Sequence, residues 1–270
     1  MQVSPSFEVR NLRFEFSSDI PKFWQGGPKS VSLFLDNLST FFPEGEKFFM
    51  RAVRRYQNQI TDPQLKADIR SFHGQEAMHT REHQKYNAFL TRNGIDADQF
   101  EKEVKAILDH VEETLPDRWK LAATAALEHF TALLAEILLD DRGLMKDAHP
   151  ELRDLWYWHA AEENEHKNVA YDVYYKVGGN YPERVLVMLL ATVVFWTKLA
   201  DQQARMMHKE GLLFSAKEWK EFIFYMFIKP APLSKLILPY LRYFKPGFHP
   251  SQSTKATRLV ERWKAEQAAG

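Results

Sequence analysis

Three side chains of the metal-binding type occur within one short stretch of this chain. His159, Glu163 and His166 are separated by four and then three residues, the spacing that places side chains on one face of an α-helix. Imidazole nitrogens and carboxylate oxygens are both good ligands for divalent transition metals. The stretch therefore predicts a helix that directs three ligands toward one point.

A second pattern of the same kind lies upstream. Glu76 and His79 form a Glu-x-x-His pair like the one that ends at His166, and each pair follows a lone glutamate, Glu46 or Glu128, by about the length of a helix hairpin. One such pair is weak evidence, because it arises on many charged helices. Two pairs, each preceded by a glutamate in apolar sequence, predict a site for two metal ions, since a buried carboxylate needs a partner.

The order of these ligands predicts the fold. Ferritin-like dimetal bundles take one Glu from each of two helices and Glu-x-x-His from each of the other two. The expected fold class is all-α, a ferritin-like four-helix dimetal bundle with extra C-terminal helices and a short extended N-terminal arm. The predicted metal ligands are Glu46, Glu76, His79, Glu128, His159, Glu163 and His166.

Two neighbouring residues compete for places in this ligand set. His83 follows His79 by four residues, so it competes with His159 for the position of a third imidazole. Glu162 lies beside Glu163 but off its face, which favours a solvated or supporting group. It would replace Glu163 only if the helix were locally rotated.

Composition excludes several other kinds of site. Among the 270 residues, 36 Lys and Arg balance 36 Asp and Glu, so no excess of charge attracts nucleic acid. The sequence contains no cysteine, which leaves nitrogen and oxygen as metal ligands and suits iron, manganese or zinc. The first residues lack the pattern of a signal peptide, so a cytoplasmic protein is expected.

The elements that must position these side chains are predicted to be helical. Residues 1–27 are expected to form an extended N-terminal arm or a short hairpin, 28–180 the metal-binding bundle, and 181–270 a C-terminal helical extension packed on the bundle in the same domain. The four helices of the bundle are expected at about 30–56, 62–92, 116–141 and 149–176, with a polar helix at about 96–113 between the second and the third. Ser30 or Ser32 is expected to cap the first of them, and Pro43 to interrupt it.

One apolar run, residues 185–197, has several interpretations. Its 13 residues fall short of the roughly 18 to 20 that cross a membrane. A buried core helix is the favoured interpretation. The alternatives are a helix that lines the pocket of an apolar small-molecule substrate and one that contacts a membrane surface. The extension also offers an interface for a homodimer.

Several of these motifs resemble a known family. The resemblance is carried by Phe42-Pro43-x-Gly45-Glu46-x-Phe48-Phe49, Gln75-Glu76-x-x-His79, Leu127-Glu128-His129-Phe130-Thr131-Ala132, Trp158-His159-x-x-Glu162-Glu163-x-Glu165-His166-Lys167 and Pro246-Gly247-Phe248-His249-Pro250. Over about residues 30 to 250, the chain resembles a bacterial family of predicted metal-dependent hydrolases, which groups with ferritin-like proteins. More distantly, its ligand order is similar to that of the di-iron arylamine N-oxygenases, whose sites use three histidines and four carboxylates. That likeness implies His159, rather than His83, as the third imidazole.

The expected cofactor is a pair of metal ions, iron first, with manganese and zinc as alternatives. Four carboxylates against two divalent ions leave a near-neutral site, which is consistent with a reduced di-iron pair that binds O2. The sequence is therefore interpreted as an oxygen-activating di-iron oxidoreductase, an oxygenase, with an apolar small or medium-sized substrate, O2 and an electron donor as partners. The alternative is a metal-dependent hydrolase that uses a metal-bridged hydroxide. A third interpretation is a non-catalytic metal-binding bundle.

Overall fold

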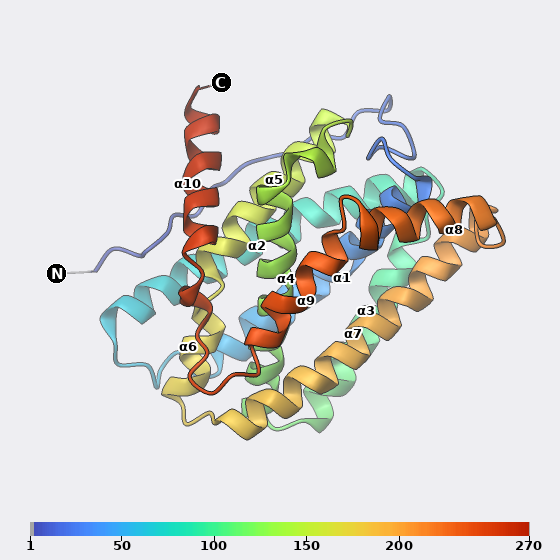
Figure 1. The fold of residues 1–270 in the computed structure, drawn as a ribbon. Coiled ribbons are helices and arrows are strands. Elements are labelled where there is room, and N and C mark those ends of the chain that lie inside the picture. The colour runs from blue at the N-terminus through green and yellow to red at the C-terminus, as the bar shows by residue number, and fades with distance from the viewer. Residues whose placement is uncertain (1–2, 270) are drawn as a thin grey trace.

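The computed structural model describes residues 3–269, and this part of the chain contains helices and no β-strand (Figure 1). The α-helices are α1 (Lys29–Arg54), α2 (Pro63–Arg92), α3 (Ala97–Thr114), α4 (Asp117–Asp140), α5 (Pro150–His166), α6 (Val169–Lys176), α7 (Tyr181–Lys209), α8 (Ala216–Ile223), α9 (Pro232–Arg242) and α10 (Thr254–Ala269). Shorter turns of other helix types are η1 (Arg142–Met145), η2 (Phe224–Ile228) and η3 (Pro250–Gln252). The all-α class is confirmed, while the relation to ferritin-like bundles stays a prediction.

In the described part of the N-terminal arm, residues 3–17 run as a largely extended segment and not as a hairpin, and residues 18–27 form turns. Carboxylates of α2 and α5 accept hydrogen bonds from its backbone. Ser6 N donates to Asp68 of α2 at 2.6 Å and Ser17 N donates to Glu151 of α5 at 2.8 Å. These contacts hold the arm across the outside of the two helices that carry the Glu-x-x-His motifs.

Helix α1 runs through Pro43 without the predicted interruption. A proline inside a helix leaves the carbonyl four residues earlier without its helical partner. Here that carbonyl belongs to Ser39, and Asn87 Nδ2 of α2 donates to it at 3.2 Å. A tertiary contact therefore replaces the missing hydrogen bond and lets the helix continue toward Glu46.

Two helix ends also differ from the sequence prediction. Neither Ser30 nor Ser32 caps α1, and Ser30 instead donates to Glu218 of α8 at 2.7 Å. The helix expected over 149–176 is divided into α5 and α6 by a turn directly after His166. Asn168, a residue type of low helix propensity, lies at this turn.

The helices α1, α2, α4 and α5 form the bundle (Figure 1), and the predicted ligands that they carry are buried. Buried apolar side chains form two clusters, one toward each end of these helices. Along α1, the apolar residues of the first cluster lie within 31–38 and those of the second within 48–53. Glu46 therefore lies between the two clusters. Glu76 and His79 lie in the same way between Phe72 and Tyr86 of α2. The packing of both clusters thus fixes the height of the ligands along the bundle.

Helix α7 is not the buried core helix favoured for residues 185–197. Leu186, Leu190 and Val193 are exposed, because one face of the helix packs on the bundle and the other packs on nothing within residues 3–269. By length and composition α4 and α7 are both able to cross a membrane, and α8 with η2 and α9 would form a bent third span. The apolar window of α4 is 61% buried, however, and that of α7 only 22%. Contact with a membrane therefore concerns α7 first, and the expected cytoplasmic location stays a prediction.

The later helices pack on the bundle. Helices α7 and α9 lie against α4, and α10 lies against α5. This agrees with an extension packed on the bundle, although the predicted division at 28–180 and 181–270 stays a prediction. Helices α9 and α10 lie within the residues expected to form the C-terminal helical extension.

Candidate metal centre

The seven predicted ligands lie together in the interior, and each is 4% exposed or less. Three groups of them have ligand atoms that all lie within 4.8 Å of one another. These groups are Glu46, His79 and His159; Glu76, His79 and Glu163; and Glu76, Glu128 and His166. Because Glu76 and His79 each belong to two groups, the three groups form one continuous cluster contributed by α1, α2, α4 and α5.

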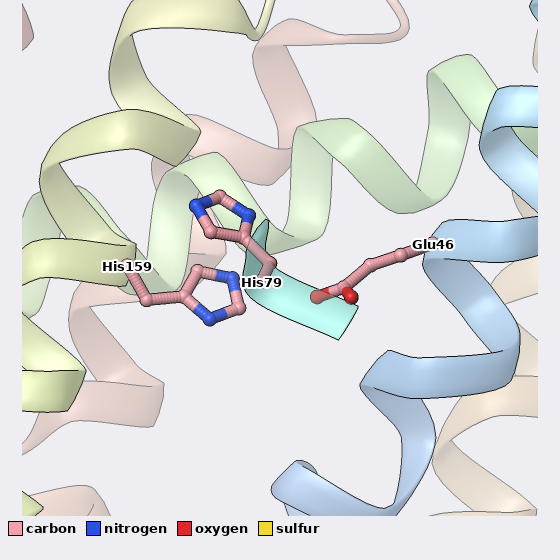
Figure 2. Close-up of side chains that lie close together, drawn as sticks. All are labelled: Glu46, His79 and His159. Carbon is pink, nitrogen blue, oxygen red and sulfur yellow. The ribbon is translucent and has the colours of Figure 1, made fainter. Parts of the chain in front are cut away.

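Figure 2 shows the group formed by Glu46, His79 and His159. The rings of His79 and His159 are stacked, with their centroids 4.2 Å apart, and the carboxylate of Glu46 is directed toward them. Thr80 Oγ1 donates to Glu46 Oε2 at 2.8 Å. The other oxygen, Oε1, has no hydrogen-bond partner.

Many ligand atoms of the cluster are buried without a hydrogen-bond partner. Such atoms are uncommon, because leaving one unsatisfied costs about 1–3 kcal/mol. The unpartnered atoms here are Glu46 Oε1, both carboxylate oxygens of Glu76 and of Glu128, Glu163 Oε2, His79 Nδ1 and His166 Nε2. They are all carboxylate oxygens and imidazole nitrogens. This set of donors fits metal ions held by nitrogen and oxygen.

Glu162 and Arg10 orient His79. His79 Nε2 lies 3.0 Å from Glu162 Oε2, and the other oxygen of Glu162 accepts from Arg10 at 3.1 Å. An ionised carboxylate only accepts, so we assign the proton to Nε2 and leave Nδ1 free for a metal. Nδ1 lies 3.6 Å from Glu163 Oε1 and 4.0 Å from Glu76 Oε2. Glu162 is fully buried and is therefore not solvated. It orients His79 and does not take the place of Glu163.

Gln75 orients His166 in a similar way. Gln75 Nε2 donates to Glu165 at 2.9 Å, so its Oε1 is the acceptor for His166 Nδ1, also at 2.9 Å. His166 Nε2 is then left facing the carboxylates, 3.3 Å from Glu76 and 3.4 Å from Glu128. The two Glu-x-x-His histidines therefore offer different nitrogens, Nδ1 of His79 and Nε2 of His166.

His83 supports His159 and belongs to none of the three groups. Its Nε2 lies 2.6 Å from His159 Nδ1, and its Nδ1 lies 2.9 Å from Ser39 Oγ. His159 Nε2 points the other way and lies 2.9 Å from Glu163 Oε1. Of the two competitors, His159 is the one beside the carboxylates. Its binding to a metal stays a prediction, as it does for the other six ligands.

The carboxylates differ in their affinity for protons. Burial raises the pKa of Glu46 to about 8, and burial together with repulsion from Glu128 raises the pKa of Glu76 well above its usual value. Burial also raises the pKa of Glu128. For Glu163, burial is outweighed by attraction to His166 and by hydrogen bonds, so its pKa lies well below the usual value. Without metal, protons therefore offset part of the negative charge.

The histidines also divide into two kinds. Burial lowers the pKa of His79 and His166, but the hydrogen bond to Glu162 raises that of His79 to about 9 and attraction to Glu128 raises that of His166 to about 10. Burial and the neighbouring His79 lower the pKa of His159 to about 4. His159 is thus neutral at pH 7, the form that binds metals, while His79 and His166 must lose a proton first.

An apolar cavity of about 170 Å³ reaches the cluster at Glu46, His159 and Glu163. Side chains of α1, α3, α4 and α5 form most of its wall. The rest comes from the later helices, including Phe195 of α7 and Leu233 of α9. Within residues 185–197 only Phe195 lines this cavity, and the interpretation of the run as a pocket wall stays a prediction.

Three residues beside the ligands were missed by sequence reasoning. Arg10 contacts Glu162 from the N-terminal arm, and no local pattern connects residues so far apart. Gln75 immediately precedes a predicted ligand, but its own role depends on α5. Thr80 follows Glu76 by four residues, so helical spacing was a usable signal for it.

Comparison with known proteins supports the motif resemblance. The family described as predicted metal-dependent hydrolase matches residues 8–254. The matched segment includes all seven predicted ligands and extends from the arm to the first residue of α10. No curated protein and no solved structure matches the chain. The grouping with ferritin-like proteins therefore stays a prediction.

Proposed function

Because the chain belongs to the family of predicted metal-dependent hydrolases, we propose that it is an enzyme that uses two metal ions to hydrolyse an apolar substrate. The proposed ligands are Glu46, Glu76, His79, Glu128, Glu163 and His166, with His159 as a seventh. The observation that carries this proposal is the set of buried, unpartnered carboxylate oxygens and imidazole nitrogens on four helices. Two ions are proposed because Glu46 and Glu128 lie in separate groups of ligands.

Bound ions would lower the pKa of a shared water molecule and polarise a carbonyl or phosphoryl oxygen of the substrate. The four carboxylates balance the charge of two divalent ions. Arg10 with Glu162 and Gln75 with Glu165 hold the two Glu-x-x-His histidines in fixed orientations. Thr80 holds one oxygen of Glu46, so Oε1 is the atom left to bind a metal or to take a proton at the end of the pocket.

The proposed substrate carries an acyl or alkyl chain. Its apolar part would lie against the wall formed by Phe195, Leu233 and the aromatic side chains of α1, while its reacting group would meet Glu46, His159 and Glu163. Apart from these three residues, the wall offers few polar groups that a polar substrate could bind. The proposal therefore favours esters or amides of apolar acids over sugars or nucleotides.

A second candidate reaction is oxidation of an apolar substrate by O2, with iron as the metal and an external electron donor. One observation favours it. The cavity that reaches the cluster is apolar along almost its whole wall, which admits O2 more readily than water. A ligand set of four carboxylates and three histidines, with His159 included, is also compatible with iron.

Isotope labelling separates the two reactions. Protein loaded with iron, manganese or zinc is incubated with a medium-chain aryl ester and a chemical reductant as electron donor in ¹⁸O-labelled water, with and without O2. Hydrolysis predicts turnover without O2 and incorporation of label from water into the acid product. Oxidation predicts no turnover without O2 and, with labelled O2 in ordinary water, incorporation of label from O2.

Glu128→Gln tests whether the cluster is the active site. The substitution keeps the shape of the side chain but removes one anionic ligand, and we expect activity to fall at least about 100-fold with loss of bound metal. Glu136→Gln, on the same helix and partly exposed, is the matched control. Full activity in Glu128→Gln would contradict the proposal.

A further inference from the structure

Helix α7 exposes a continuous row of apolar side chains. Leu186, Leu189, Leu190, Val193 and Val194 repeat at intervals of three and four residues and are 45–61% exposed. The helix carries no charged residue between Arg184 and Lys198. Large exposed apolar areas of this kind mark sites of association with another protein or with a membrane.

A second exposed row follows on the chain from α8 to α9. Phe224, Phe227, Ile228, Leu238 and Leu241 are 45–71% exposed. Helix α9 lies beside α7, since Tyr240 of α9 is within 2.9 Å of Thr192 of α7, and both helices cross the same side of the bundle in Figure 1. We refer to the exposed apolar side chains of α7 and of residues 223–241 as the apolar surface.

The second of these rows lies in a positively charged segment. Residues 222–260 contain no Asp or Glu, although the whole chain carries equal numbers of acidic and basic residues. Lys229, Arg242 and Lys245 are exposed in this segment. Beside Phe224, a hollow of about 340 Å³ is lined by Lys229 and two lysines of α8, together with Glu221. A basic margin around an apolar centre matches the chemistry of a bilayer with anionic headgroups.

The inner face of α7 is bonded to the bundle by polar side chains. Gln202 Nε2 donates to the carbonyl of Phe100 at 3.2 Å, and Gln203 Nε2 donates to the carbonyl of Ser30 at 3.0 Å. Both glutamines are buried. Only the opposite face is available for lipid, which is the geometry of a helix lying along a membrane surface and not crossing it.

We propose that the apolar surface docks on a bilayer that contains anionic lipids, with its apolar side chains at the acyl boundary and its lysines at the headgroups. A second copy of the chain fits less well, because it would bring the basic residues of two copies together while residues 222–260 supply no carboxylate to pair with them. The same segments line the pocket through Phe195, Met226 and Leu233. The pocket therefore lies one helix layer from the lipid. The substrate of the pocket would then be an acyl lipid from the bilayer. This assignment of the substrate rests on the proposed function, whereas docking does not.

Sedimentation with vesicles tests docking without substrate or turnover. The full chain is mixed with vesicles of phosphatidylcholine, alone or with added phosphatidylglycerol, and binding is expected to be stronger to the anionic vesicles and to weaken with salt. Val193→Asp combined with Leu238→Asp is expected to weaken binding at least about tenfold, because two apolar side chains are replaced by anions. Lys229→Gln with Lys245→Gln is expected to weaken it about fivefold per charge on anionic vesicles.

Leu12→Asp is the matched control, because Leu12 is an apolar side chain of the N-terminal arm that is 39% exposed. Its binding is expected to equal that of the wild type, and circular dichroism checks that every variant is folded. Equal binding by the wild type and the Val193→Asp, Leu238→Asp variant would overturn docking. So would a wild-type dimer that this variant converts to a monomer, because the surface would then belong to a second copy. Vesicle binding by a chain without hydrolytic activity supports docking and contradicts only the proposed function.

Discussion

The metal centre and the apolar surface depart from ordinary protein burial in opposite directions. In the centre, Glu76 and Glu128 are buried with both carboxylate oxygens unpartnered. On the apolar surface, Val193 and Leu238 are more than half exposed. Unpartnered polar atoms in the interior destabilise the fold itself, whereas exposed apolar atoms mainly favour association. The difference indicates that metal ions bound at the centre would mainly change the stability of the fold. A partner bound at the apolar surface would mainly change where the molecule is located.

Loading with metal is expected to have the largest effect on stability. Ions that bind only the folded chain, at about a thousand times their dissociation constant, stabilise it by about 4 kcal/mol. For a chain of this size this raises Tm by on the order of 10 °C. Calorimetry of chelator-treated protein before and after addition of iron, manganese or zinc measures the shift. An unchanged Tm with all three metals would show that the unpartnered atoms of the centre do not bind them.

Glu128→Gln should remove most of that effect while leaving the metal-free chain almost unchanged. Burial raises the pKa of Glu128 even with His166 beside it, so the fold gains no stability from the charge of this group when no metal is bound. We expect the metal-free variant to lie within about 1 kcal/mol of the metal-free wild type. With metal present, the variant should hold well under two ions per chain by elemental analysis. Two ions per chain in the variant would mean that Glu128 is not a ligand.

The pH dependence of the metal-free protein follows from the same cluster. The pKa of Glu46 rises from 4.5 to about 8 and that of His79 from 6.5 to about 9, so the folded chain holds these protons more tightly than the unfolded chain. Their stabilisation is complete below the unfolded pKa values and is lost as the pH rises through the folded ones. Glu163, with its lowered pKa, contributes the opposite dependence below pH 4.5.

Tm of the metal-free protein is therefore expected to fall between about pH 6.5 and pH 9, above the range in which the lowered pKa of His159 acts in the opposite direction. The stabilisation added by metal should instead grow over this range, because the ions displace protons from His79 and His166. Scanning calorimetry across pH, with and without metal, measures both slopes. If the plots of Tm against pH run parallel with and without metal, the metal does not bind at these protonated residues.

How far the sequence predicts each region depends on how local its signals are. The ligands of α2 and α5 follow helical spacing, and Asp62 with Pro63 marks the start of α2, where Asp62 accepts from the backbone of residues 64 and 65. The contact of Arg10 with Glu162 joins the arm to α5 and has no local signal. Continuity of α1 through Pro43 likewise depends on a side chain of another helix.

The apolar surface was less predictable for a different reason. The run 185–197 is apolar on all sides, so its pattern does not reveal which face is buried. The structure buries Val187 and Met188 and exposes Leu189 and Leu190. Only the packing of α7 on α4 separates these neighbours, and that packing depends on the whole bundle.

Glu162→Gln should have a smaller effect, confined to the metal centre. The neutral amide of this variant would hold His79 Nε2 less firmly than an ionised carboxylate does, and we expect metal affinity to fall by about 10- to 100-fold. The control is Glu82→Gln, because Glu82 is equally buried and also contacts the arm but touches no predicted ligand. Metal titration followed by calorimetry compares the two. An equal loss of affinity in both variants would indicate that the arm acts through general packing and not through His79.

The smallest effect on stability is expected at the apolar surface. Val193→Ala removes methyl groups that are already 61% exposed, so the free energy of unfolding should change by no more than about 0.5 kcal/mol. Leu199→Ala, on the same helix but at a side chain only 2% exposed, should cost about 2–5 kcal/mol because it leaves a cavity. Denaturant titration of dilute protein in the absence of lipid measures both. A cost for Val193→Ala close to that for Leu199→Ala would mean that Val193 is buried in solution against another copy of the chain. Stability would then depend on protein concentration, and the contrast between the metal centre and the apolar surface would no longer hold.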